Sequence, residues 1–326
     1  MFQPMTAQLG LGMAALGRPG YVTLDHAAAL GGDYEPAAME SHAHEVLDAA
    51  HDLGVRYFDM ARSYGRAEDF FASWLAKKRL APGDVTVASK WGYTYTAGWS
   101  THAEQHEVKD HSLATFTRQF GESIQRLDGY LSLYQIHSVT AEGKTFDDDS
   151  LIGAIAKLKE KGIRAGFSTS GPGQANAIRR SLELERDGRR VFDSVQSTWN
   201  LFECGAEAAL SEAHDAGMKV VIKEALANGR LTHGNHSEDP VLSMHLSKIR
   251  TIAENHGTTI EMLALASALA RPWADFVLSG AATVAQMTTN AHAREFKLSE
   301  ELDAELRAFA VNSNDYWRAR SGFSWN

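Results

Sequence analysis

The sequence predicts a single-domain (β/α)8 barrel, or TIM barrel, with a C-terminal extension. Three observations indicate this fold: eight short apolar segments separated by amphipathic ones, a length of 326 residues, and no Pro/Gly/Ser-rich linker that would divide the chain. Eight strand-helix units in such a length favour a closed parallel barrel, although an open doubly wound sheet has the same pattern. We expect the barrel over residues 1–311 and a tail over residues 312–326.

The eight apolar segments have the length and the composition of buried strands. Several of them end on a polar residue. They lie at residues 9–13, 55–60, 84–90, 130–137, 163–168, 192–197, 218–223 and 275–280.

Amphipathic helices are expected between these strands. Residues 41–54 carry apolar side chains at helical spacing. The segment from Asp149 to Gly162 repeats this pattern, with Asp149 or Ser150 as the expected N-cap. Residues 262–270, MLALASALA, are far too few to span a bilayer, so we expect a buried helix there.

The composition and the charge restrict the partners of the protein. It is 44% hydrophobic and 22% charged, as soluble globular proteins are, and its net charge of -9 argues against binding nucleic acid. The single cysteine, Cys204, cannot form an internal disulfide. The first basic residue is Arg18, so the amino terminus lacks the charged region of a secretory signal. We expect a cytoplasmic protein that binds neither nucleic acid nor membrane, with the oligomeric state left open.

Four polar residues predict a catalytic site. Asp59, Lys90 and His137 end the second, third and fourth predicted strands, and Tyr64 follows shortly after Asp59. In a parallel barrel, the loops after the strands open on one face, where active sites of this fold lie. The alternatives are a structural ion pair, a packed tyrosine ring and a hydrogen-bonded histidine. All four residue types on neighbouring strand ends favour catalysis over these alternatives.

The four residue types suit the reduction of a carbonyl group. Hydride transfer creates an alkoxide that needs a proton, and a tyrosine phenol can donate it. Because a free tyrosine has a pKa of about 10, we expect the Lys90 ammonium to lower the pKa of Tyr64. Asp59 would keep Lys90 protonated, and His137 would hydrogen-bond the carbonyl oxygen. This chemistry needs no metal.

Three segments, YFDMARSYG, SKWG and LYQIHS, resemble the signature of the aldo-keto reductases, and GFSTS, QSTWN, VVIKEALANGRL and SGAATVAQMTTN extend the resemblance over nearly the whole chain. The resemblance implies an oxidoreductase that interconverts an aldehyde or ketone and the alcohol, acting on a small-molecule substrate. The cofactor would be NADP(H), with NAD(H) possible. The resemblance assigns catalysis to Asp59, Tyr64, Lys90 and His137. It assigns cofactor binding to Ser168, Thr169, Gln196 and the loop from Ser279 to Asn290.

Lys223 departs from the family pattern. It stands where many relatives have an aromatic residue that stacks on the nicotinamide ring. A lysine pointing at an oxidised nicotinamide would be repelled by its positive charge. We therefore expect Lys223 to turn aside toward Glu224.

A second departure concerns the adenosine end of the cofactor site. Gly280 and Gln286 stand where relatives commonly have Lys or Arg for the 2′-phosphate of NADP, whereas Asn290 is retained. Arg230 or Arg294 could supply the missing charge. The choice between NADP(H) and NAD(H) therefore stays open.

Aromatic residues after the third strand and in the tail predict a substrate pocket. Residues 91–99 contain four aromatic side chains, among them Trp91 and Tyr93. Such density is typical of an aromatic pocket wall and, equally, of a long loop packed on the barrel rim. Trp317 of the tail could complete the same wall, which would place the tail over the pocket.

Two other functions fit parts of the sequence. A cofactor-sensing regulatory module would share the fold, but the full set of catalytic residue types disfavours it. A metal-dependent enzyme could use His102 and His106, yet HAEQH lacks the Glu that a metalloprotease needs after its first His, and no third ligand stands out. The glycines of GLGMAALG do not fit GxGxxG, which disfavours an open dinucleotide-binding sheet.

Overall fold

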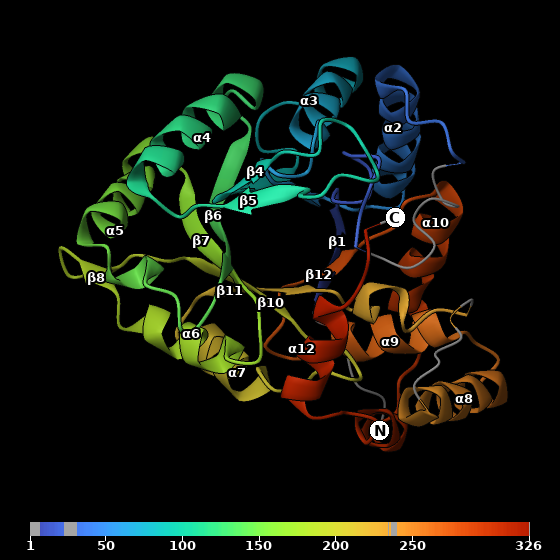
Figure 1. Cartoon of the computed structure of the whole chain (residues 1–326). Coiled ribbons are helices and arrows are strands. Elements are labelled where there is room, and N and C mark those ends of the chain that lie inside the picture. Colours follow the sequence, from blue (N-terminus) through green and yellow to red (C-terminus); the bar gives the residue numbers. More distant parts are fainter. Residues whose placement is uncertain (1–6, 23–30, 234, 236–239, 326) are drawn as a thin grey trace.

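The structure, a computed structural model, describes residues 7–22, 31–233, 235 and 240–325. Its centre is a closed barrel of parallel strands in the order β1-β12-β11-β10-β7-β6-β3-β2 (Figure 1). The strands are β1 (Gln8–Gly12), β2 (Tyr57–Asp59), β3 (Thr86–Trp91), β6 (Leu131–Val139), β7 (Arg164–Thr169), β10 (Ser194–Thr198), β11 (Lys219–Lys223) and β12 (Phe276–Ser279). Each overlaps one predicted strand, and β1 pairs with both β2 and β12. The predicted barrel is confirmed and the open sheet is excluded.

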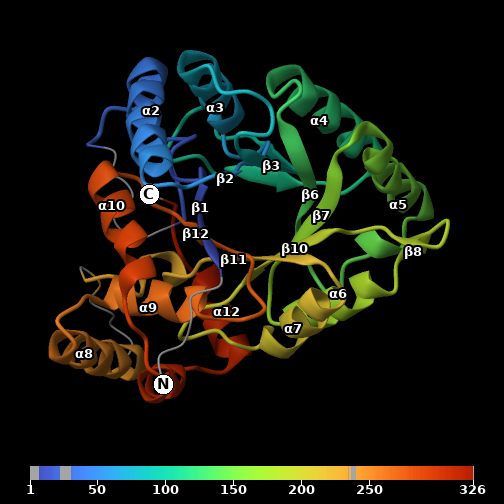
Figure 2. The same ribbon diagram turned by 180° about the vertical axis from the view of Figure 1, so that it is seen from behind.

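Helices surround the barrel, as Figures 1 and 2 show from opposite sides. They are α2 (Pro36–Asp52), α3 (Ala67–Lys78), α4 (Leu113–Arg126), α5 (Asp149–Ala156), α6 (Gln174–Leu182), α7 (Glu207–Asp215), α8 (Pro240–Asn255), α9 (Ile260–Leu269), α10 (Val284–His292), α11 (Glu300–Arg307) and α12 (Ser313–Ser321). Short 3-10 segments are η1 (Thr145–Asp147), η2 (Lys157–Lys161), η3 (Ala227–Gly229) and η4 (Ala293–Glu295). Two antiparallel hairpins pair β4 (Tyr93–Tyr95) with β5 (Glu107–Lys109) and β8 (Glu185–Arg186) with β9 (Arg189–Arg190).

The predicted helices form, with differences at their ends. Helix α2 begins at Pro36, upstream of its predicted start, because proline is favoured in the first turn of a helix. Helix α5 is capped by Asp148 instead of Asp149 or Ser150, since the Asp148 side chain accepts a hydrogen bond from the Leu151 amide at 3.0 Å. Helix α9 buries nearly all of its side chains, as predicted. Within the described ranges, no helix is both long and apolar enough to cross a membrane.

The barrel interior changes from apolar to polar along the strands. Its lower layer is a small apolar cluster of Tyr57, Ala88, Leu133, Val221 and Leu278. Two residues further along four of these strands stand Asp59, Lys90, Gln135 and Lys223. Because side chains alternate along a strand, these residues face the same interior as the cluster. Polar and charged groups therefore collect at the carboxyl ends of the strands.

The outward faces of the strands hold this arrangement in register. Phe58 lies between two inward residues and packs outside the barrel against Phe71 and Trp74 of α3, with ring centroids 5.1 and 5.5 Å apart. A shift of one residue would turn the Phe58 ring toward the polar interior of the barrel. It would place Asp59 among the apolar side chains between the barrel and α3. Burial of Phe58 thus directs Asp59 into the barrel.

At Gly17, the loop after β1 packs closely against the loop after β2. A Cβ atom at Gly17 would lie 2.2 Å from the Tyr64 carbonyl oxygen and 2.5 Å from the Ala67 side chain. The Gly17 carbonyl also accepts a hydrogen bond of 2.7 Å from the Arg66 amide. The two loops meet through their backbones, which fixes the segment that carries Tyr64.

We expect Gly17→Ala to destabilise the protein by roughly 1–3 kcal/mol, because the backbone atoms that the new methyl would overlap cannot move aside cheaply. Chemical unfolding followed by circular dichroism measures the change. The control is Gly121→Ala on the exposed face of α4, where a Cβ would meet no atom within 4 Å. Alanine there should stabilise by about 0.5–1 kcal/mol. Equal stabilities for the two variants would contradict the close approach at Gly17.

Candidate functional site

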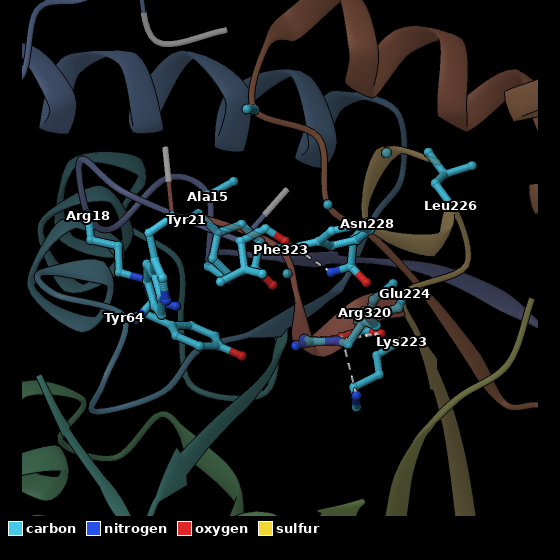
Figure 3. Close-up of a pocket in the computed structure, with 18 of the residues that line it drawn as sticks. Ala15, Arg18, Tyr21, Tyr64, Lys223, Glu224, Leu226, Asn228, Arg320 and Phe323 are labelled. Atoms are coloured by element: carbon cyan, nitrogen blue, oxygen red, sulfur yellow. Dashed lines mark hydrogen bonds and ion pairs between the residues drawn. The ribbon is translucent and has the colours of Figure 1, made fainter. Parts of the chain in front are cut away.

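A cavity of about 1080 Å³ opens at the carboxyl ends of the barrel strands. Its lining includes the strand-end residues Gly12, Asp59, His137, Gln196, Lys223 and Ser279. The tail contributes Arg320, Ser321, Phe323 and Trp325. Figure 3 shows Tyr64 on one side of the cavity and Lys223, Glu224 and Arg320 facing it from the other. Residues from the two ends of the chain therefore share one cavity.

Lys90 and Asp59 form a fully buried ion pair at the floor of the cavity. The Lys90 ammonium donates hydrogen bonds to Asp59 Oδ2 and, at 2.8 Å, to the Met60 carbonyl. Asp59 Oδ1 accepts hydrogen bonds from the amides of Gln196 at 2.9 Å and Gln135 at 3.2 Å. Burial lowers the pKa of Lys90, and the charge of Asp59 partly offsets this effect. The carboxylate is thus held on both oxygens and holds the lysine in turn.

Tyr64 lies between two cations. Its ring centroid is 4.8 Å from Lys90 Nζ and 5.1 Å from Arg18 Cζ. Burial nevertheless raises the pKa of Tyr64 well above 10, with a smaller contribution from Asp59, and Arg18 only partly offsets the increase. The prediction that the pKa of Tyr64 falls below its usual value is therefore wrong for the described arrangement. Lys90 is bonded to Asp59, and the loss of hydration outweighs the charge of Arg18.

His137 completes the group of predicted catalytic residues. Its ring meets the Tyr64 ring edge-on at a centroid distance of 5.5 Å and the Tyr93 ring at 5.0 Å. Burial, together with the charges of Lys90 and Arg18, holds the pKa of His137 well below 6.5. The imidazole is therefore neutral at neutral pH. Its Nδ1 atom is buried and has no hydrogen-bond partner among the described residues.

An irregular strand end positions His137. Strand β6 changes register against β7 between Ile136 and Val139, and Ser138 has a left-handed backbone with φ of 58°. The Ser138 amide donates to Ser168 Oγ at 2.8 Å, and the His137 carbonyl is bonded to the His111 ring at 2.8 Å. Ser168 thus has a local hydrogen-bonding role at this bend.

Several of the predicted cofactor-binding residues line the cavity: Gln196, Lys223, Ser279, Gly280, Gln286 and Asn290. The last four belong to the segment from Ser279 to Asn290, which is held by hydrogen bonds between its own residues. Asn290 donates to Ser279 Oγ at 2.9 Å, and Gln286 Oε1 accepts from the Ala282 amide at 2.8 Å. The segment from Ser279 to Asn290 contains neither Lys nor Arg. This end of the cavity is polar but uncharged.

Other predicted cofactor-binding residues lie behind the cavity wall. Ser168 and Thr169 do not line the cavity. Thr169 Oγ1 is engaged by Gln174 and Ser197, at 3.0 and 2.8 Å. Arg230 also lies outside the lining, with its guanidinium 4.1 Å from the Tyr316 ring centroid. Ser168, Thr169 and Arg230 could therefore affect a bound ligand only indirectly, through the residues that line the cavity.

Arg294, the alternative source of charge for a 2′-phosphate, is bound elsewhere. Its guanidinium donates to the carbonyls of Ala291 and Leu53, at 3.0 and 2.8 Å. Arg294 is not part of the cavity lining.

Of the aromatic residues predicted for the substrate pocket, only Tyr93 lines the cavity. Trp91 follows the inward Lys90 and so faces outward, where it packs on Phe116 and His111 at centroid distances of 5.1 and 5.8 Å. Trp317 is buried beneath the charged groups of the tail wall, with Lys223 Nζ 5.7 Å from its ring. Both predictions are corrected: these rings support the cavity from behind.

Arg18 is a cavity residue that the sequence did not single out. It is buried, and its Nη1 donates to the Ser63 carbonyl at 2.7 Å and to Glu107 at 2.9 Å. Its guanidinium also lies 4.5 Å from the Trp325 ring centroid. Arg18 thus joins the loop before α3, the β4/β5 hairpin and the tail.

The expected pair between Lys223 and Glu224 is confirmed, at 3.6 Å. Lys223 also donates to Thr198 Oγ1 at 2.8 Å, and Arg320 of α12 donates to Glu224 at 2.7 Å. Burial would raise the pKa of Glu224, but Lys223 and Arg320 hold it well below 4.5. Only the tertiary structure brings Arg320 to this carboxylate.

His102 and His106 do not lie on one helical turn, since they belong to the loop between β4 and β5. The His106 ring stacks on Trp325 at 4.2 Å, with 2° between the ring planes. The described part of the chain brings no three His, Cys, Asp or Glu side chains together as metal ligands would be. His106 instead supports the tail.

A model of the aldo/keto reductase family matches residues 9–310. The chain belongs to this family. It is similar to an aldo-keto reductase from Strobilurus tenacellus, with 24% identity over 95% of this chain and 91% of that one. It is also similar to a D-threo-aldose 1-dehydrogenase from a Pseudomonas species, with 25% identity over 93% and 96%. Aldo/keto reductase family members are oxidoreductases, and this chain is one of them.

Solved structures share the family fold. The holo form of an aldo-keto reductase from Bacillus halodurans has a TM-score of 0.71 and 24% identity, covering 95% of this chain and 96% of that one. A glycerol dehydrogenase from Gluconobacter oxydans has a TM-score of 0.68 and 21% identity, over 92% and 90%. Both likenesses concern the barrel.

We expect Asp59→Asn to lower the free energy of unfolding by about 3–5 kcal/mol, because it leaves the Lys90 ammonium buried without its carboxylate. Urea unfolding measures the loss. The double variant Asp59→Asn/Lys90→Met also removes the unpaired ammonium charge of Lys90, so it should recover part of the lost stability. An Asp59→Asn protein as stable as the parent would refute the ion pair as a structural support.

Proposed function

We propose that this aldo/keto reductase family member interconverts an aldehyde or ketone and the alcohol with NAD(P)(H), using Tyr64 as the general acid/base. The observation that carries the proposal is the meeting of Tyr64 and His137 in the cavity, with ring centroids 5.5 Å apart. A carbonyl oxygen near both rings would be in reach of a phenol and a neutral imidazole. The phenol can donate the proton that an alkoxide needs, and the imidazole can hydrogen-bond the oxygen.

The described residues fit a dinucleotide in extent and polarity. The cavity runs from the strand ends to the start of α10, and Gln196, Ser279, Gln286 and Asn290 offer uncharged hydrogen-bonding groups along it. We assign cofactor binding to these residues, to the open backbone at Gly280, and to Lys223. Ser168, Thr169 and Arg230 would act from behind the wall. The bound cofactor supplies the hydride.

The protein's part in the reaction is to orient the carbonyl and to deliver a proton. Neutral His137 keeps one ring N–H, which can donate a hydrogen bond to the carbonyl oxygen. The high pKa of Tyr64 keeps the phenol protonated at neutral pH, so the proton is present when the alkoxide forms. The buried pair of Lys90 and Asp59 holds the Tyr64 side of the cavity in place.

Tyr64→Phe should reduce turnover at least 100-fold, because general acid catalysis contributes about 10²–10⁴-fold. Steady-state oxidation of NADH and NADPH with a panel of aldehydes and ketones measures the loss. Tyr93→Phe is the matched control, since Tyr93 also lines the cavity and touches His137. Full turnover in Tyr64→Phe would disprove the acid assignment. Tight cofactor binding without turnover of any carbonyl by the parent protein would favour a cofactor-sensing regulatory module instead.

The uncharged loop from Ser279 to Asn290 supports a cofactor preference for NAD(H) over NADP(H), since a 2′-phosphate is normally met by Arg or Lys. We expect Gln286→Arg to raise kcat/KM for NADPH relative to NADH by about tenfold, equal to one charge-assisted contact. Thr289→Arg, also exposed on α10, is the control and should leave the ratio unchanged. If the parent protein already strongly prefers NADPH, the preference for NAD(H) is wrong.

A further inference from the structure

The charged groups of the cavity are not evenly balanced. Lys90 is paired with Asp59, and Arg18 is paired with Glu107 at 2.9 Å. On the opposite wall, one carboxylate, Glu224, faces two cations, Lys223 at 3.6 Å and Arg320 at 2.7 Å. Two positive charges against one negative charge leave this wall with an excess of one positive charge.

The other charges around the cavity do not cancel this excess. Arg230 packs beside the wall, where its charge acts on both Glu224 and Glu203. Lys223 also adds to the positive charges that lower the pKa of His137, after burial, Lys90 and Arg18. Two more carboxylates line the cavity: Glu104 is exposed, and Glu261 accepts a hydrogen bond from the His233 amide. Within a largely buried wall, a single unbalanced charge attracts an anion strongly.

Arg320 is oriented to use this charge. Its Nε and Nη2 atoms bind Glu224, at 3.3 and 2.7 Å, whereas Nη1 has no hydrogen-bond partner in the described part of the chain. The guanidinium points across the cavity toward the hydroxyl of Tyr64, from the opposite wall (Figure 3). A guanidinium with a free edge is well suited to a planar carboxylate.

We propose that the substrate carries a carboxylate, which Arg320 binds with the help of Lys223 while the carbonyl lies at Tyr64. The substrate class is therefore an oxo acid with an aldehyde or ketone group, or the matching hydroxy acid in the reverse direction. A carboxylate, with one charge, matches the excess on the wall better than a phosphate ester does, with close to two. The inference rests on the proposed oxidoreductase function.

The test compares substrates that differ only in the charge. Initial rates are measured for 4-oxobutanoate against butanal and for 5-oxopentanoate against pentanal, with glyceraldehyde 3-phosphate as the phosphate probe. The parent protein should prefer each acid over its neutral partner by at least tenfold in kcat/KM. Arg320→Met should reduce this acid-to-neutral ratio by about 10- to 100-fold, mainly through KM for the acid, since a hydrogen-bonded charge pair is lost. Arg320→Lys should retain part of the preference.

Arg318→Met is the matched control. Arg318 lies on the same helix, is largely exposed, and among the described residues forms an ion pair only with Asp315, at 2.8 Å, so the ratio should not change. Thermal unfolding of all variants shows whether the tail still docks. If Arg320→Met lowers the rates for acid and neutral substrates equally, Arg320 only fastens the tail to Glu224 and the inference is wrong. A parent protein that prefers the neutral aldehydes, or the phosphate, also overturns it.

The failure of this inference can be distinguished from failure of the proposed function. Turnover of neutral aldehydes without a preference for acids contradicts the inference alone. If no carbonyl is reduced although the cofactor binds, the proposed function fails. Titration of the cofactor complex with succinate, followed by Trp fluorescence or calorimetry, then still tests the anion site. Binding that is equal in the parent and Arg320→Met would reject it.

Discussion

The buried ion pair of Lys90 and Asp59 is the constraint around which the site is organised. Two charges inside a barrel are tolerated only where both are fully bonded, and here the carboxylate is held by the lysine and by two glutamine amides. The strand alternation that places these groups inward also places Phe58 outward, into the apolar core between the barrel and α3. The polar floor of the cavity and the hydrophobic core are therefore two results of one strand register.

Above this floor, loops distant in the sequence depend on one another. Gly17 allows the backbone near Tyr64 to approach, and Arg18, the next residue, lies between the rings of Tyr64 and Trp325. The tail is fastened a second time where Arg320 meets Glu224. Glu224 itself has a left-handed backbone with φ of 54°, which a non-glycine residue adopts only when its surroundings hold it there. The ion cluster and the loop conformation thus support each other.

The sequence predicted the strands well because each is an apolar run between polar ends, and it predicted Asp59, Lys90 and His137 because strand ends share one face. It failed for Trp91, since the residue after an inward lysine must face outward. It failed for the pKa of Tyr64 because the burial that raises this pKa arises only when the chain is folded. The meeting of Lys223, Glu224 and Arg320 could not be predicted either, because no local pattern records a contact between β11 and α12.

The division of labour between barrel and tail has an evolutionary consequence. The proposed acid–base residues are held by strand register and by a buried charge pair, so substitutions among them disturb the core. Helix α12 and the residues after it follow the last barrel strand and reach the cavity from outside. They contribute Arg320, Phe323 and Trp325 to the cavity wall. Substitutions in this segment change the shape and charge of the wall without altering the barrel interior. Changes in the tail can therefore alter what the cavity admits while the proposed reaction centre stays the same.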